Sequence, residues 1–99
     1  MNHVVNVVIQ VLPLGIPKSD AYKIVDAAIG CIQSSALKYR VCPFETVIEG
    51  PYSDVMKLLD DVQLACNAAG AEEVIINMKL QRSFIKDVSI GDKMEQYEL

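Results

Sequence analysis

The segment ETVIEGP, residues 45–51, decides the fold, because a short β pattern, charged side chains and a backbone breaker meet in it. Its three central residues are β-branched, stiff at χ1 and better suited to a pleated strand than to a helix. Alternation with a period of two places Thr46 and Ile48 on one face. The other face then carries Val47 between two carboxylates, the second of which is Glu49. The terminal Gly-Pro pair ends the strand, since proline lacks the N–H that a ladder needs.

Composition indicates one folded domain spanning residues 1–99. The chain has 52% hydrophobic and 22% charged residues, which excludes a disordered polyelectrolyte. A mean hydropathy of +0.26 in so small a chain predicts more apolar surface than one monomer hides, so we expect self-association. The net charge is −4 and the nine basic residues are scattered, which argues against a nucleic-acid partner.

Neither a membrane span nor a metal site is expected. No run approaches the roughly 18 apolar residues that cross a bilayer, and the first residues do not resemble a signal peptide, so we expect a cytoplasmic protein. The three cysteines, Cys31, Cys42 and Cys66, have no CxxC spacing. We interpret them as reduced, buried, small apolar side chains.

Hydrophobic periodicity and turn residues predict seven elements. They are a strand at 4–12, a helix at about 19–35, strands at 37–42 and 45–49, a helix from 53 to about 69, a strand at 73–80 and a short helix beginning near 89. Ser19 and Ser53 are the expected N-caps and Gly70 the expected C′ residue. Gly30, inside the first helix, implies close packing against a sheet. The order β-α-β-β-α-β predicts an α+β fold of the ferredoxin-like kind, with two helices on one face of a four-stranded antiparallel sheet.

The sheet face away from the helices is the functional question. The first strand turns a wholly apolar face of Val5, Val7, Ile9 and Val11 toward the helices. The open face collects polar side chains between branched apolar ones: Asn6, Gln10, Glu45, Glu49, Asn77 and Lys79. Such a face usually packs against another copy of the chain. Amides and carboxylates trapped there need partners, which a polar ligand can supply.

Several short motifs are spread along the chain: VLPLG at 11–15, LKY at 37–39, Pro43, TVIEG at 46–50, AGA at 69–71, KLQR at 79–82 and DK at 92–93. Together they resemble one known family, the small thiamine-binding proteins of ferredoxin-like fold, related to proteins of hydroxymethylpyrimidine and thiamine salvage. The TVIEG segment in its β-α-β-β-α-β context is the most specific of them. The resemblance covers nearly the whole chain. One departure is Phe44-Glu45, where relatives often carry a small or polar residue and where bulk would narrow a ligand site.

The resemblance implies a homodimer or dimer of dimers that holds thiamine or its pyrimidine moiety at the sheet face and subunit interface, without catalysis and without a further cofactor. A carboxylate can accept from the aminopyrimidine or pair with the thiazolium cation, amides can satisfy ring nitrogens, and aromatic rings can stack. The candidate ligand residues are Glu49, Thr46, Asn6, Gln10, Asn77, Tyr39 and Phe44. Each has a structural alternative: Glu49 as a solvated charge, Thr46 as an inward β residue, and the amides as partners across a subunit boundary.

Other functions known for proteins of this strand order require residues that the chain lacks. An RNA-recognition module needs aromatic residues on its central strands. A metallochaperone needs paired cysteines in the loop after the first strand, and residues 13–19 have none. An acyl-phosphate hydrolase needs an anion-cradling loop with an arginine. No nucleophile and base pair indicates an enzyme. The remaining alternative is an assembly or regulatory domain whose sheet face binds only protein.

Overall fold

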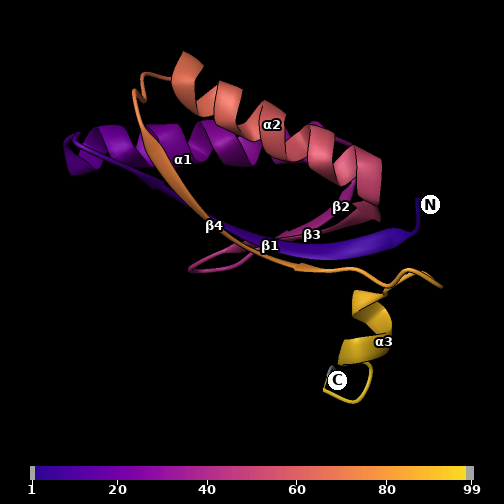
Figure 1. Cartoon of the computed structure of the whole chain (residues 1–99). Coiled ribbons are helices and arrows are strands. Elements are labelled where there is room, and N and C mark those ends of the chain that lie inside the picture. The colour runs from indigo at the N-terminus through magenta and orange to yellow at the C-terminus, as the bar shows by residue number, and fades with distance from the viewer. Residues whose placement is uncertain (1, 98–99) are drawn as a thin grey trace.

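A computed structural model describes residues 2–97 as one sheet with three helices. In chain order the elements are β1 (Val4–Pro13), α1 (Lys18–Gln33), β2 (Lys38–Val41), β3 (Thr46–Pro51), α2 (Tyr52–Ala68), β4 (Val74–Gln81) and α3 (Ile90–Met94). The strands pair antiparallel in the order β2-β3-β1-β4, so β1 and β3 are central. Helices α1 and α2 cover one face, and α3 lies on the opposite side (Figure 1). The predicted ferredoxin-like arrangement is confirmed.

The core lies between the sheet and the two long helices, where alternation along the strands placed it. Val5, Val7 and Ile9 of β1 are at most 2% exposed, and Thr46 and Ile48 of β3 are buried beside them. From α2 the core receives a stripe of five side chains: Val55, Leu58, Leu59, Val62 and Cys66. The apolar stripe predicted for this helix is therefore confirmed, because its residues recur at helical spacing.

Both long helices begin differently from the prediction. α1 starts at Lys18 and α2 at Tyr52, each directly after a proline, and neither has a side-chain cap. The predicted N-caps Ser19 and Ser53 lie inside the first turns instead. Proline fixes φ near the helical value, so the chain can enter a helix without a serine cap. In α2 the side chain of Asn2 supplies the missing acceptor, since its Oδ1 receives the backbone N–H of Ser53 at 2.9 Å.

Apolar residues of α1 at helical spacing predict a buried stripe of Tyr22, Val25, Ala28, Ile29 and Ile32, and the observed stripe is rotated from it. Its buried residues are Ile24, Ala28 and Ile32, spaced four apart, whereas the predicted Tyr22 is 60% exposed. The expected close packing at Gly30 is also wrong, because a Cβ placed there would meet nothing within 4 Å. The tyrosine ring and the short glycine both belong to the margin of the helix, outside the contact with the sheet.

The end of α2 follows the prediction. Gly70 has a φ of +114°, which side chains with a Cβ rarely adopt. The N–H of Gly70 donates to the carbonyl of Asn67, and the N–H of Ala71 donates to that of Cys66, each at 3.0 Å. These two bonds satisfy carbonyls that the helix end would otherwise leave open, which is the Schellman arrangement.

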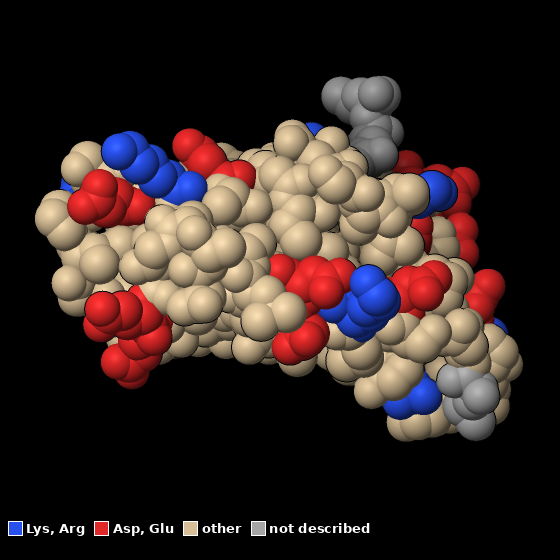
Figure 2. Space-filling view, turned by 90° about the horizontal axis from the view of Figure 1, so that it is seen from above, with Lys and Arg blue, Asp and Glu red and all other residues tan. Residues whose placement is uncertain are grey.

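Charges on the helix side are mixed. Figure 2 shows Lys and Arg side chains scattered among Asp and Glu over α1 and α2, with no basic patch on this face. Among residues 2–97 no helix is long and apolar enough to cross a membrane. The helices thus present a dispersed charge pattern to their surroundings.

Two glycine substitutions should change stability in opposite directions. Gly70→Ala forces a Cβ into the left-handed region and should lower the free energy of unfolding by about 1 kcal/mol. Gly30→Ala, in an ordinary helical conformation with open space around it, should raise the free energy of unfolding by about 0.5 to 1 kcal/mol. Urea denaturation followed by circular dichroism measures both. A destabilised Gly30→Ala protein would show that this position packs against something after all.

Candidate functional site

The C-terminal segment, residues 87–94, lies across part of the sheet face that the long helices leave open. It is fixed at its start by β1: the N–H of Val4 donates to Asp87 Oδ1 at 2.8 Å, and the N–H of Val88 donates to the carbonyl of Val4 at 2.9 Å. Val88 is 8% exposed. Ser89 then caps α3, its hydroxyl accepting from the N–H of Asp92 as the predicted capping box requires. The segment is therefore docked on the sheet.

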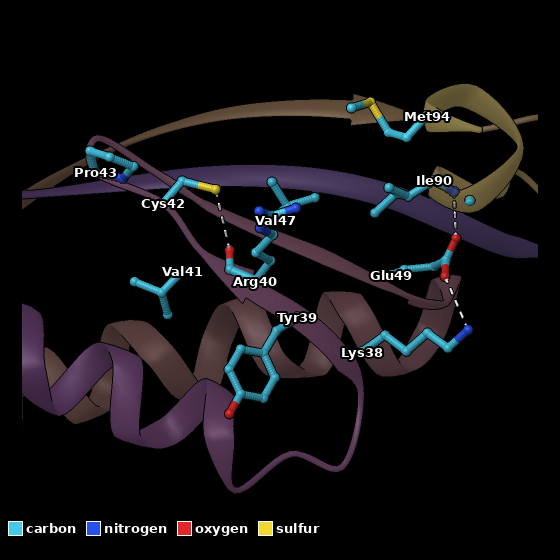
Figure 3. A pocket seen from close by; sticks show the side chains of 11 residues that line it. Lys38, Tyr39, Arg40, Val41, Cys42, Pro43, Val47, Glu49, Ile90 and Met94 are labelled. Atoms are coloured by element: carbon cyan, nitrogen blue, oxygen red, sulfur yellow. Dashed lines mark hydrogen bonds and ion pairs between the residues drawn. The ribbon is translucent and has the colours of Figure 1, made fainter. Parts of the chain in front are cut away.

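Glu49 stands at the centre of this contact. It lies on β3 opposite Asn6 of β1 and Lys38 of β2, and its side chain is only 11% exposed. Oε1 accepts the N–H of Ile90 at 2.8 Å and the side-chain amide of Asn6 at 3.2 Å, while Oε2 lies 3.8 Å from Lys38 Nζ (Figure 3). This carboxylate is a shared acceptor for three separate parts of the chain.

Asn6 is buried, and the nitrogen of its side-chain amide is hydrogen-bonded. Its Nδ2 donates to the carbonyl of Val88 at 3.0 Å as well as to Glu49, which fixes the orientation of the amide. Its Oδ1 is buried and has no hydrogen-bond partner among residues 2–97. An unpaired buried acceptor costs about 1 to 3 kcal/mol. The docked segment thus encloses an acceptor that still lacks a donor.

A cavity of about 520 Å³ opens beside Glu49, between the β2–β3 hairpin and α3. Its walls come from both elements, and the lining residues are Lys38, Tyr39, Arg40, Val41, Cys42, Pro43, Val47, Glu49, Ile90, Gly91 and Met94. Figure 3 shows Ile90 and Met94 on the α3 side and Cys42 and Pro43 at the hairpin, with Glu49 at one end. An apolar enclosure with a few charged groups and this volume suits a small organic molecule. We call it the Glu49 cavity.

Two further hollows flank it. One, also of about 520 Å³, lies on the other side of α3 and is lined in part by Lys79, Gln81 and Lys93. There Lys93 Nζ already donates to Gln81 Oε1 at 2.6 Å. The other, of about 450 Å³, lies between α1 and the β2–β3 hairpin on the helix side of the sheet. No carboxylate lines the hollow beyond α3 among the described residues, which distinguishes it from the Glu49 cavity.

The structure brings together two of the seven sequence-predicted ligand residues, Glu49 and Asn6. Gln10 and Asn77 also face the open side and bond to each other, with Asn77 Nδ2 donating to Gln10 Oε1 at 3.3 Å. Gln10 lies four residues beyond Asn6 along β1, roughly 13 Å at the usual rise of a strand. The two amides therefore form a pair within the chain, separate from Glu49, whereas the structural alternative for them was a partner across a subunit boundary.

The other three predicted residues do not join Glu49 on the open face. Thr46 is 7% exposed and faces the helices beside Ile48, which fits its structural alternative. Tyr39 borders the Glu49 cavity, but its ring points to the helix side, away from Glu49 (Figure 3). Phe44 is 82% exposed in the hairpin loop and lines the hollow beside α1. Because Phe44 lies outside the Glu49 cavity, its bulk does not close that cavity.

Sequence reasoning missed Lys38 and Arg40 of β2 and the contribution of the C-terminal segment. Lys38 and Arg40 line the cavity from β2, and Ile90 and Met94 line it from α3. The strand pattern already placed both cations on one face. Only one observation pointed indirectly to a covering segment such as α3. The amide of Asn6 would need a hydrogen-bond partner if anything covered it.

The thiols have different environments in the described chain, and all three are free. Cys66 is buried and Cys31 half-buried, and burial raises the pKa of both thiols, with further contributions from Asp61 near Cys31 and from Cys31 near Cys66. Both stay protonated and unreactive at neutral pH. Cys42, half-buried at the hairpin, lines the Glu49 cavity. The expectation of wholly buried cysteines therefore holds for Cys66 alone.

Comparison with known proteins identifies the class of protein that this fold and site define. The profile of a family described as thiamine-binding protein matches residues 7–98. Because the match covers most of the chain, the protein belongs to the thiamine-binding protein family. A UPF0045 protein of Clostridium perfringens is 36% identical over 75 residues, which are 76% of this chain and 78% of the relative.

Solved structures share the fold over nearly their whole length. A domain of unknown function, DUF77, from Bacillus cereus is 35% identical, has a TM-score of 0.91, and aligns over 99% of this chain and 93% of its own. A Thermotoga maritima protein, provisionally described as one of thiamine biosynthesis or salvage, is 23% identical. Its TM-score is 0.86, with 96% of this chain and 99% of that chain covered. At that identity the second likeness shows the fold alone.

Removing the Glu49 side chain should loosen the C-terminal segment. Glu49→Ala leaves the Ile90 N–H without an acceptor and should lower the free energy of unfolding by about 1 to 3 kcal/mol. Hydrogen exchange at the Ile90 amide should quicken. Glu49→Gln keeps an amide oxygen in place of Oε1 and should lose less than Glu49→Ala. Lys38→Ala, which removes only an exposed ion pair, should change stability by no more than about 0.5 kcal/mol. Equal losses for all three variants would contradict the shared-acceptor role.

Proposed function

We propose that this protein binds thiamine or its aminopyrimidine precursor in the Glu49 cavity, without changing it chemically. The observation that carries the proposal is the Glu49 carboxylate, held at 11% exposure at the end of an apolar cavity of about 520 Å³. The family to which the chain belongs is named for thiamine binding. The proposal thus rests on a charged acceptor, a cavity of suitable size and a family whose name gives the ligand class.

The polar chemistry matches an aminopyrimidine. Glu49 Oε2 lies 3.8 Å from Nζ of the exposed Lys38, which is a long ion pair, so an exocyclic amino group can compete for this oxygen. Hydrogen bonds to an ionised carboxylate are stronger than those between neutral groups. Oε1 stays engaged with Ile90 and Asn6, which holds the carboxylate in a fixed orientation. A fixed acceptor lowers the ordering cost of binding.

The apolar walls suit a flat heteroaromatic ring. Val47 forms the floor on β3, and Ile90 and Met94 cover it from α3. The methionine thioether is polarizable and makes favourable contacts with aromatic rings. A pyrimidine ring placed on Val47 would thus be enclosed on both faces, with its amino group near Glu49.

The lining residues support the proposal of binding rather than catalysis. Cys42 is the nucleophilic side chain among them, and no histidine accompanies it in the described lining. Nucleophilic catalysis by a thiol normally relies on an adjacent general base to activate it. We infer that the ligand leaves the cavity in the form in which it entered.

Titration calorimetry with thiamine and with its pyrimidine alcohol tests the proposed function. We expect saturable binding to the wild-type protein and a loss of about 10- to 100-fold in affinity for Glu49→Gln, the range for a hydrogen bond to a charged group. Glu72→Gln removes an exposed carboxylate in the loop between α2 and β4 and serves as the matched control. Absence of heat with either compound at high protein concentration would refute the ligand assignment.

We further propose that the protein acts as a homo-oligomer built through the open sheet face. Leu12 and Ile75 are opposite each other on that face, 38% and 46% exposed. Contiguous exposed apolar side chains on a sheet favour contact with a partner surface. A second copy of the chain offers the same apolar pair, so a two-fold contact would bury both.

Sedimentation velocity measures this association. The wild-type protein should sediment as a dimer or tetramer, and Ile75→Glu should shift it toward monomer because a charge would replace a buried contact. Tyr22→Glu, on the helix side, is the control and should leave the assembly unchanged. A monomeric wild-type protein at micromolar concentration would overturn the proposal.

A further inference from the structure

The hollow beyond α3 has a volume of about 520 Å³, and no carboxylate is among its described lining residues. Its floor is formed by Val8 of β1 and Val47 of β3, which are paired on the open sheet face. Met94 lines it from α3, and two cations, Lys79 of β4 and Lys93 of α3, line it as well. We call it the Lys79 hollow. Apolar walls with two cations suit an apolar molecule that carries a negative charge.

Neither cation of the Lys79 hollow is neutralised by a carboxylate. Lys79 makes no ion pair with another residue in the range 2–97. Lys93 Nζ donates to Gln81 Oε1 at 2.6 Å, but that amide is neutral and the ammonium group has two further N–H donors. An ammonium group binds an anion more strongly than it binds a neutral amide. The hollow therefore offers two positive charges to a bound molecule.

A buried acceptor lies at the edge of the same hollow. Asn6 lines it and is 5% exposed, and its Oδ1 has no hydrogen-bond partner among the described residues. Its Nδ2 donates to Glu49 on β3, so Oδ1, at the other end of the planar amide, lies on the side of β4, where Gln81 is opposite Asn6. Asn6 is not among the described residues that line the Glu49 cavity. The unpaired oxygen therefore belongs to the Lys79 hollow.

The cations and the acceptor are close enough for one small molecule to reach both. Lys79 is a diagonal neighbour of Asn6 across the β1–β4 ladder, and such neighbours are about 7 to 8 Å apart. Gln81 lies directly across from Asn6, so its bond with Lys93 closes the approach to Oδ1 from β4. An anion in the hollow would draw Lys93 away from that neutral amide. A donor on the same molecule would then have access to Oδ1.

We propose that the Lys79 hollow binds a small apolar carboxylate that also carries a hydroxyl or N–H donor. Lys79 and Lys93 bind the carboxylate, the apolar body packs on Val8 beneath α3, and the donor pairs with Asn6 Oδ1. The apolar floor favours a monoanion over the more strongly hydrated dianion of a phosphate ester. The inference does not rest on thiamine binding, because Glu49 is not among the described residues of this hollow.

Titration calorimetry with related probes tests the inference. Para-hydroxybenzoate has both groups, benzoate lacks the donor, and the methyl ester of para-hydroxybenzoate lacks the charge. We expect saturable binding of para-hydroxybenzoate, with a loss of about 3- to 10-fold for benzoate and about 10- to 100-fold for the ester, the ranges for hydrogen bonds to neutral and to charged groups. The affinity for para-hydroxybenzoate should fall as the salt concentration rises. Omitting the hydroxyl from the probe tests Asn6 without a substitution that would also break its bonds to Glu49 and Val88.

Two lysine variants locate the carboxylate. Lys79→Gln should weaken the binding of para-hydroxybenzoate about 10-fold and leave that of its methyl ester unchanged, since only the carboxylate needs the charge. Lys23→Gln removes an exposed cation from α1 on the helix side and is the matched control, which should leave all the affinities unchanged. Circular dichroism confirms that each variant keeps its fold.

Nuclear magnetic resonance of labelled protein locates the donor. The side-chain amide resonances of Asn6 should shift with para-hydroxybenzoate and much less with benzoate. Equal affinities for the probes, an equal loss in Lys23→Gln, or no saturable binding of para-hydroxybenzoate would overturn the inference. None of these results would affect the proposed function of the Glu49 cavity, which thiamine titration tests separately.

Discussion

The hydrogen bonds that Glu49 Oε1 accepts determine the architecture of the open sheet face. A single oxygen receives the backbone N–H of Ile90 and the side-chain amide of Asn6, so β1, β3 and the C-terminal segment meet at one point. Side-chain bonds of this kind are charge-assisted and stronger than neutral ones. Without them, α3 would have few polar links to the sheet, and the Glu49 cavity would lose the wall that Ile90 and Met94 provide.

The two oxygens of the Glu49 carboxylate make different kinds of contact. Oε1 is used within the fold, whereas the contact of Oε2 with Lys38 is long and largely exposed. An exposed ion pair contributes little to stability, so exchanging that partner costs the folded state little. The carboxylate can therefore be fixed in orientation through Oε1 while Oε2 is available to another partner. Burial of the unpaired Asn6 Oδ1 shows in addition that the docked segment is not at an optimum of polar satisfaction.

Most of the fold could be predicted from local patterns. Alternation in ETVIEGP set the inward position of Thr46 and Ile48, and Gly70 marked the end of α2 through its backbone freedom. The helix starts were not predictable from serine caps, because prolines replaced them. The position of α3 was also beyond local reasoning, since it depends on contacts between residues such as Asn6 and Val88, 82 positions apart.

The candidate site, like the fold, could be predicted from the sequence only in part. Glu49 was identified from its strand and its family context, and alternation placed Lys38 and Arg40 together without revealing what they surround. Tyr39 could be recognised as a ring near the site, yet its side follows from the pairing of Tyr39 with Ile48, which only the sheet register fixes. Residues supplied by the strands, Asn6 and Glu49 among them, were thus within reach of the sequence, and residues supplied by the C-terminal segment were not.

The long-range anchoring of the C-terminal segment has a consequence for the order of events during synthesis. The backbone N–H of Val4 bonds to the side chain of Asp87, which is synthesised 83 residues later. This part of the open sheet face therefore stays uncovered until Asp87 has been made. Closing so long a loop is slow compared with forming hairpins and helices. The hairpin of β2 and β3 and both long helices can therefore form while Asn6 and Glu49 are still hydrated. The Glu49 cavity can be completed only after residues 90–94, which form one of its walls, have been made.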